Sequence, residues 1–274
     1  MARSTLAKVA LYAVLSLVVV LSLGPALWVV VSSFKTSVQT LSGDSPFWPT
    51  PFSLEGYAAA LDLVQWRPFA NTFLYAAGGT IGAIGIAALA AYPLTRFPVR
   101  GGAVLITAFS VALAIPVVGM AVPEFFIMRT FGLLDTRVGM VLFYSALFFP
   151  ISFVILRSFF AGLPREMEEA AVIDGAGYWR ILAVVIAPLA RPALATVGVV
   201  AFIGIWNEFF YANLLINSVE VQNIQTALAA FKGQFRFNAS AVLAGTTLAM
   251  LVPVTIFLVL QRYVISGLTA GAGK

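Results

Sequence analysis

Val9 to Phe34 reads VALYAVLSLVVVLSLGPALWVVVSSF, and this stretch decides the fold class. It contains no charged residue and exceeds the roughly 18 apolar residues that mark a membrane-spanning helix. Arg3 and Lys8 precede it, as basic residues precede the core of a signal peptide. The run is far longer than the 7–15 residues or so of such a core, and no small-x-small cleavage site lies ahead of Trp28. We therefore expect an uncleaved spanning helix.

The rest of the chain repeats this character. It has 274 residues, of which 61% are hydrophobic and 10% charged, with a mean hydropathy of +0.99. Five more apolar stretches of this kind follow: Pro68–Thr95, Gly101–Pro123, Val138–Leu156, Pro192–Asn207 and Phe237–Gln261. The pattern predicts an all-α membrane protein with six spanning helices in a single membrane domain, residues 1–274.

The distribution of basic residues predicts the orientation. If the N-terminus is cytoplasmic, ten of the sixteen Lys and Arg residues fall in cytoplasmic segments. Because basic residues concentrate on that side of a membrane, we expect both termini there. The net charge of +5 then reflects topology, and the basic residues form no run or patch that would suit nucleic acid.

Several kinds of chemistry are excluded by composition. The chain contains no cysteine and no histidine, which removes disulfides, thiolate chemistry, Cys/His zinc sites and His-based acid–base catalysis. The C-terminal GLTAGAGK lacks the spacing of a phosphate-binding loop and the Ser or Thr that would hold magnesium. We expect no enzymatic activity, cofactor or metal in this chain.

The second predicted span is rich in small residues. Gly78 and Gly82 lie four residues apart, as do Ala83, Ala87 and Ala91. Such faces let helix backbones approach closely in lipid. We interpret them as packing within the chain rather than as a dimerisation motif.

One polar segment interrupts the apolar pattern. It reads EEAAVIDGAGYWR from Glu168 to Arg180, between the fourth and fifth predicted spans. Pro164 suits the first turn of a helix, and the acids that follow it favour a helix N-terminus. Gly175 predicts a helix stop, and a second short helix is expected over Tyr178–Ile186. From the residues alone, a solvated loop and a docking element are equally supported.

The same segment resembles the EAA loop of permease subunits in binding-protein-dependent ABC importers. Glu169-Ala170-Ala171 and Gly175 match the family pattern, and Pro188 keeps its final proline, although smaller apolar residues precede it. Further short sequence motifs resemble those of the maltose-type, carbohydrate branch of this family. They are the Trp28…Ser33-Phe34-Lys35 exit, Ala91-Tyr92-Pro93-Leu94, Gly132-Leu133-Leu134-Asp135-Thr136, Trp206-Asn207-Glu208-Phe209 and Gly267-Leu268-Thr269-Ala270-Gly271.

This resemblance implies a multi-pass protein of a bacterial-type inner membrane. A core domain over 70–262 would follow an extra span and outer loop, 1–69, and residues 163–188 would form the coupling loop. Its contact residues for an ATPase would be Glu168, Glu169, Ala170, Ala171, Asp174 and Gly175. The implied partners are a second homologous permease, two copies of a cytoplasmic ATPase that carries ATP and Mg, and an extracytoplasmic sugar-binding protein.

A sugar crossing lipid needs hydrogen-bonding and stacking groups. The candidate path residues are the polar and aromatic side chains in or near the spans: Asn71, Tyr144, Trp206, Asn207, Glu208, Tyr211 and Asn213. An ionisable residue within a span is a functional candidate, and Glu208 is one. Equally, Glu208 could cap a helix or pair with an arginine of a partner, and Trp206 and Tyr211 could belong to an interfacial belt.

The outer loop over 216–238 is long and rich in amides. The resemblance implies that it contacts the binding protein through Gln222, Asn223, Gln225, Lys232, Gly233 and Gln234, whereas a plain connector is the simpler alternative. Other readings remain: a permease for a polyol or sugar phosphate, an ion-coupled secondary carrier, or a structural or channel subunit. A phosphate substrate would call for basic residues in the spans, and a carrier for more intramembrane charges.

Overall fold

A computed structural model describes residues 2–42, 44–230 and 238–272, and these residues contain helices and no strand. The chain divides into two compact units, each described by itself. The first comprises residues 1–66 and 227–251, and the second comprises residues 67–226 and 252–274. The domain boundaries expected from the sequence stay a prediction.

The first unit holds the N-terminal helices and the beginning of the last one. They are α1 (Ala2–Ser32), α2 (Ser37–Leu41), α3 (Glu55–Val64), the end of α13 (Ile224–Ala230) and the first part of α14 (Ala239–Ala272). Thr36 caps α2 by accepting a hydrogen bond from the backbone N–H of Gln39, whose side chain reciprocates.

Small residues let α3 and α14 approach closely. A Cβ on Gly56 would stand 2.6 Å from the backbone oxygen of Ser240, and Ala60, Ala241 and Ala244 are buried together. The hydroxyl of Ser37 bonds both Asn238 and Ser240, at 2.8 and 2.9 Å. The beginning of α14 is therefore tied to the segment that follows α1.

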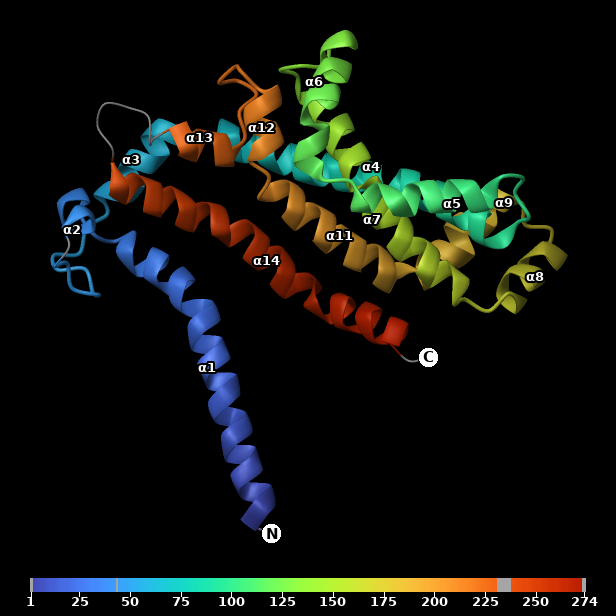
Figure 1. Ribbon diagram of the computed structural model, residues 1–274, viewed down its shortest axis with the longest axis horizontal. Helices are drawn as coiled ribbons and strands as arrows, with labels where there is room; N and C mark the ends of the chain where they lie inside the picture. The colour runs from blue at the N-terminus through green and yellow to red at the C-terminus, as the bar shows by residue number, and fades with distance from the viewer. Residues whose placement is uncertain (1, 43, 231–237, 273–274) are drawn as a thin grey trace. The chain divides into compact units, whose positions relative to one another are not determined.

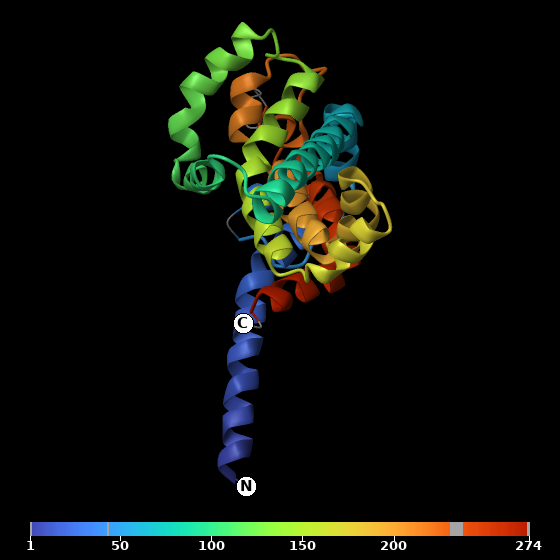
Figure 2. The same ribbon diagram turned by 90° about the vertical axis from the view of Figure 1, so that its right-hand side faces the viewer.

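The second unit carries the polar loop and all seven candidate path residues. Its helices are α4 (Arg67–Arg96), α5 (Gly102–Val111), η1 (Ala112–Ala114), η2 (Val117–Met120), α6 (Ala121–Thr130), α7 (Arg137–Ala161), α8 (Glu166–Ile173), α9 (Tyr178–Arg180), a π-helix labelled η3 (Ile181–Ile186), α10 (Ala187–Leu189), α11 (Arg191–Trp206) and α12 (Phe210–Leu215). Helices α4, α7 and α11 lie side by side in both views (Figures 1 and 2).

The small residues of α4 bring it against its neighbours. A Cβ on Gly82 would lie 2.1 Å from the hydroxyl oxygen of Ser145 on α7, and one on Gly79 would crowd both Tyr144 and Ile205. Ala83, Ala87 and Ala91 are fully buried. This confirms that the small-residue faces serve packing within the chain, where a larger side chain would separate the helices.

The predicted number of spans is recovered, with two of them bent. Within the described residues, four helical segments are long and apolar enough to cross a membrane: Ala7–Ser32, Arg67–Arg96, Arg137–Ala161 and Ala239–Arg262. Two further helix pairs pass only jointly, Gly102–Ala114 with Val117–Thr130, bent by 105°, and Tyr178–Leu189 with Arg191–Trp206, bent by 78°. Counting each pair as one span gives six.

Proline explains the first bend. Ile115 has the extended conformation (φ −75°, ψ 125°) that sterics impose on a residue before proline, and Pro116 has no N–H to continue a helix. The hydrophobic pattern alone could not reveal this, because both arms remain apolar.

Candidate functional site

The polar loop folds as a short helix closed by a glycine. Helix α8 has Glu166, Glu168 and Glu169 in its first turn. At its other end the N–H of Gly175 bonds the carbonyl of Val172 at 3.0 Å, and that of Ala176 bonds the carbonyl of Ala171 at 2.9 Å. These two bonds are those of a Schellman motif.

Gly175 is required at that turn by its conformation. Its φ is +76°, in the left-handed region expected from the sequence. Nothing lies within 4 Å of the position that a Cβ would occupy, so space is not the constraint. The turn sends the chain from α8 into the next helical segment.

That next segment differs from the expected short α-helix. The short helix predicted over Tyr178–Ile186 begins as α9 and continues as the π-helix Ile181–Ile186, and α10 follows it. Ile181 and Ile186 are buried, and both belong to a core cluster with Tyr92 and Phe160. Apolar anchoring on the core therefore overrides the regular α-helical hydrogen-bond pattern here. Wider π turns are frequent at functional sites.

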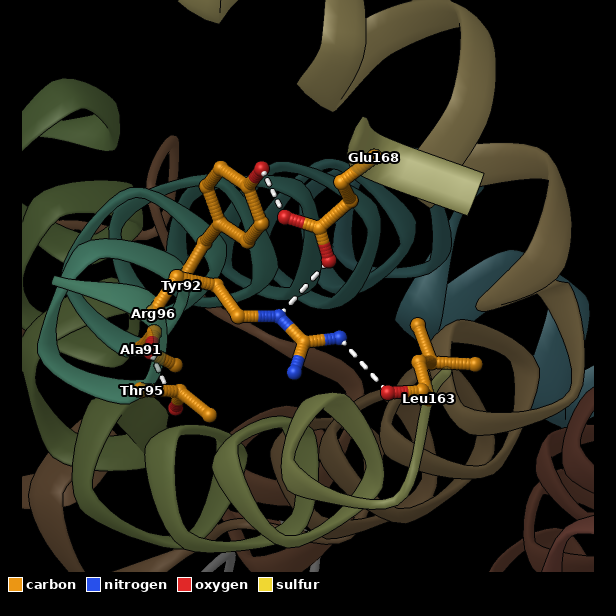
Figure 3. A network of polar contacts seen from close by, with 6 residues as sticks. All are labelled: Ala91, Tyr92, Thr95, Arg96, Leu163 and Glu168. Carbon is orange, nitrogen blue, oxygen red and sulfur yellow. Dashed lines mark hydrogen bonds and ion pairs between the residues drawn. The ribbon is translucent and has the colours of Figure 1, made fainter. Parts of the chain in front are cut away.

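Glu168 faces into the molecule, where three groups from other elements meet (Figure 3). Its Oε1 lies 2.7 Å from Nε of Arg96, and its Oε2 accepts a 2.7 Å hydrogen bond from the hydroxyl of Tyr92. Arg96 also donates from Nη2 to the carbonyl oxygen of Leu163 at 2.9 Å. The side chains of Arg96 and Glu168 are only 6% and 13% exposed.

Of the remaining predicted coupling residues, most are exposed and one packs against the core. Glu169, Ala170, Asp174 and Gly175 are exposed, whereas Ala171 is half-buried against the core. Exposed apolar side chains surround them: Met167, Val172, Ile173 and Trp179. The outer face of the loop thus combines two acids, Glu169 and Asp174, with small residues and exposed apolar side chains, which suits a groove on another protein.

A second polar centre forms where α11 ends and α12 begins. The carboxylate of Glu208 accepts three hydrogen bonds, from the Tyr144 hydroxyl at 2.7 Å and from the N–H groups of Tyr211 and Ala212 at 2.8 and 3.0 Å. A carboxylate satisfies free N–H groups at the start of a helix in this way. The geometry is that of the helix-capping alternative.

Asn71, near the start of α4, holds the segment after α12. Its amide N–H groups donate to the carbonyl oxygens of Glu220 and Gln222, at 2.9 Å each, and its Oδ1 accepts from Nε of Arg137 at 2.8 Å. Tyr75 adds a 2.7 Å bond to the carbonyl of Val221. The side chain of Asn71 is buried and fully engaged within the chain.

The other candidate path residues separate by exposure. Trp206 and Tyr211 are buried, and the Tyr211 hydroxyl donates to the carbonyl of Val117 at 2.7 Å. Asn207 and Asn213 are exposed. Of the seven candidate path residues, all of which the structure describes, these two asparagines are the exposed ones, and Glu208 is half-buried.

The amides expected to contact a binding protein are also divided. Asn223 is buried, and its amide bonds the carbonyl of Glu208 and the backbone and hydroxyl of Thr226. Gln222 and Gln225 are half-buried. Lys232, Gly233 and Gln234 lie outside the described residues.

Asp135 organises the loop before α7. It has a φ of +55°, and its Oδ1 accepts hydrogen bonds from the N–H groups of Asn217 and Ser218 and from the Ser218 hydroxyl. Burial raises the pKa of this carboxyl, but these hydrogen bonds outweigh it and hold the pKa below its ordinary value. Among the described residues, no acidic cluster is arranged to hold a metal ion.

Sequence reasoning missed residues that hold Glu168 and Asn71 in place. The pattern singles out neither Arg96 nor Arg137, and it includes Tyr92 only as part of a resemblance. A signal was present, because Tyr92 and Arg96 lie four residues apart, on one face of a helix. Their partner Glu168 is remote in sequence, so the pairing could not be read from the pattern.

Comparisons with known proteins agree across almost the whole chain. Residues 51–269 match the family described as binding-protein-dependent transport system inner membrane component. The diacetylchitobiose uptake system permease protein NgcG of Streptomyces coelicolor is 33% identical over 95% of this chain and 87% of its own length. The trehalose/maltose transport system permease protein MalG of Thermococcus litoralis is 31% identical, covering 94% of each chain.

A solved structure shows the same fold. A chain from the crystal structure of a bacterial ABC transporter involved in the import of the acidic polysaccharide alginate superposes with a TM-score of 0.84. It is 25% identical, and the match covers 95% of this chain and 97% of that one. The likeness therefore extends over both compact units.

Proposed function

The chain belongs to the family of binding-protein-dependent transport system inner membrane components, and from this premise we propose its role in detail. It is a permease subunit of an ATP-driven ABC importer and forms half of a path for a sugar or oligosaccharide. Relatives named for diacetylchitobiose and for trehalose and maltose support the carbohydrate class. Both termini are proposed to be cytoplasmic, on the distribution of basic residues.

The observation that carries this proposal is the outer face of α8. Glu169 and Ala170 are exposed beside Val172 and Ile173, on a helix whose end is fixed by the Gly175 turn. We propose that this face docks in a cleft of a cytoplasmic ATPase, with Glu169 opposite a basic residue. Closure of an ATP-loaded pair of ATPases, which hold ATP and Mg, would then move α8.

The polar centre around Glu208 supports a modified path proposal. Asn207 and Asn213 are proposed to offer amides to sugar hydroxyls, because both are exposed. Glu208, Tyr144 and Tyr211 hold one another and the start of α12, so they are proposed to shape the path. Gln222 and Gln225 remain proposed contacts of an extracytoplasmic sugar-binding protein, and the buried Asn223 is left out.

Assembly tests this function. The chain, tagged and purified from its own cells in mild detergent, is expected to bring a second permease and two ATPase copies with it. The binding protein is identified from the same cells, and its thermal stabilisation is measured against a panel of sugars. A transport-active complex without any ATPase would contradict the importer role, and stabilisation only by polyols or sugar phosphates would change the substrate class.

Glu169→Lys tests the docking face. Reversing an interfacial charge costs about 2 kcal/mol or more, so ATPase affinity is expected to fall at least about 30-fold. Glu166→Lys is the matched control, since Glu166 is exposed in the same turn and the change has the same effect on the helix dipole. Equal ATPase recovery with both variants would show that this face does not dock through Glu169.

A further inference from the structure

Glu168 and Glu169 are neighbours with opposite surroundings. Successive residues on a helix point about 100° apart, so adjacent carboxylates can serve different partners. Glu169 is exposed, whereas Glu168 is held by Arg96 and Tyr92 of its own chain (Figure 3). A residue engaged in this way is not free to contact an ATPase, so its role must be sought inside the molecule.

The bonds around Glu168 connect α8 to the last turn of α4. Arg96 is the basic residue of that turn, and it binds on both sides of Pro164, to the Leu163 carbonyl and to the Glu168 carboxylate. Its guanidinium thereby fixes the chain's exit from α7 and the first turn of α8 at once. We call Tyr92, Arg96 and Glu168 the α4–α8 junction.

Aromatic packing stiffens the junction. The ring of Tyr92 is 1% exposed and lies among Phe160 of α7, at 6.0 Å between ring centroids, and Tyr178 of α9, at 5.4 Å. One tyrosine therefore touches the helices on both sides of the loop while its hydroxyl bonds Glu168. Displacing α8 alone would break an ion pair that is almost fully desolvated, which is costly.

We propose that the α4–α8 junction makes α8 and α4 move as one body, so that a push on α8 reaches a membrane-spanning helix. This inference rests on the proposed importer function. Glu168 is then a positioning residue that transmits movement, and the docking contact belongs to Glu169. Without the junction, α8 would still bind an ATPase but would move by itself.

Spin-label distances test the proposal. The chain has no cysteine, so cysteines introduced at the exposed positions Leu89 on α4 and Ile173 on α8 give a label pair. The distance is measured in the purified complex before and after trapping with ATP, magnesium and vanadate. The same complex without introduced cysteines supplies the background from partner chains. With the junction intact, we expect one narrow distribution that trapping leaves unchanged.

Glu168→Gln removes the charge while keeping the size of the side chain. It is expected to produce a second distance on trapping, with ATPase recovery equal to that of the parent chain. Glu166→Gln, which removes a charge from the same turn, should behave as the parent chain does. A destabilised fold would lower recovery instead, so the two readouts separate transmission from stability.

Four further outcomes test the proposal. An unchanged, narrow distribution in Glu168→Gln after trapping would overturn the proposal. If that variant does not accumulate, Arg96→Gln, which removes the other charge of the ion pair, is expected to give the second distance, and an unchanged distribution there would overturn the proposal equally. Charge exchange, Arg96→Glu with Glu168→Arg, should restore the single distance. Absence of an ATPase from the parent complex would instead contradict the proposed function.

Discussion

The two ends of α4 hold their loops by different means. Near its start, Asn71, Thr72 and Tyr75 bond backbone groups of residues 220–224, all through uncharged side chains. Near its end, one buried ion pair between Arg96 and Glu168, with a single tyrosine hydroxyl, holds α8. The segment over residues 220–224 is thus fixed by several weak contacts, and α8 is fixed by fewer but stronger ones.

This difference matters because neutral and ionic contacts fail differently. Loss of one neutral hydrogen bond leaves its neighbours in place and costs about 1 kcal/mol. Loss of one partner in a buried ion pair strands the other charge and costs several kcal/mol. A buried ion pair gives a stiff connection, which suits a loop that must follow an external push. Several neutral hydrogen bonds give redundancy, which suits a loop that must keep its shape.

Arg96→Ala should give the largest effect. It leaves the carboxylate of Glu168 without its cation, and we expect a loss of about 3 kcal/mol in the free energy of unfolding. The measurement is thermal inactivation of the purified complex in detergent, with Arg100→Ala as a control because Arg100 is exposed beyond the same helix. A loss no greater than the control's would remove the contrast between the two ends.

Asn71→Ala should cost less although it breaks more bonds. Three hydrogen bonds disappear, but Tyr75, Thr72 and Arg137 still hold the same segment. We expect about 1–2 kcal/mol by the same assay, since two neutral hydrogen bonds and one donated by the charged Arg137 are lost while the other contacts remain. Asn213→Ala, at an exposed asparagine, serves as the reference. A cost equal to that of Arg96→Ala would mean that the outer segment has no redundancy.

Much of the fold followed from local pattern. The apolar windows predict the spans because lipid forces backbone groups to pair within a helix. Gly175 predicts the left-handed turn because few other residues adopt it cheaply, and the structure confirms this conformation. These features depend only on residues close together in the chain.

The features that escaped prediction depend on distant partners. Glu168 was assigned to the same contact surface as Glu169, because sequence cannot say which neighbour meets an arginine 72 positions away, at Arg96. The π-helix at Ile181–Ile186 escaped for the same reason, since it follows from core packing rather than from helix propensity. For Glu208, capping and path lining were both open until the Tyr211 and Ala212 N–H groups were placed.

Asp135 keeps its hydrogen bonds in the loop before α7 to a lower pH than a carboxyl group of ordinary pKa would. Its pKa is lower in the folded chain than in the unfolded one, so its contribution to stability is complete above the unfolded pKa. That contribution disappears as the pH falls through the folded pKa. If this loop faces the exterior, acidification outside the cell must pass below the ordinary carboxyl range before Asn217 and Ser218 are released. Resistance to thermal inactivation should fall less steeply with decreasing pH in Asp135→Asn than in the parent chain. Parallel curves for the two chains would contradict this.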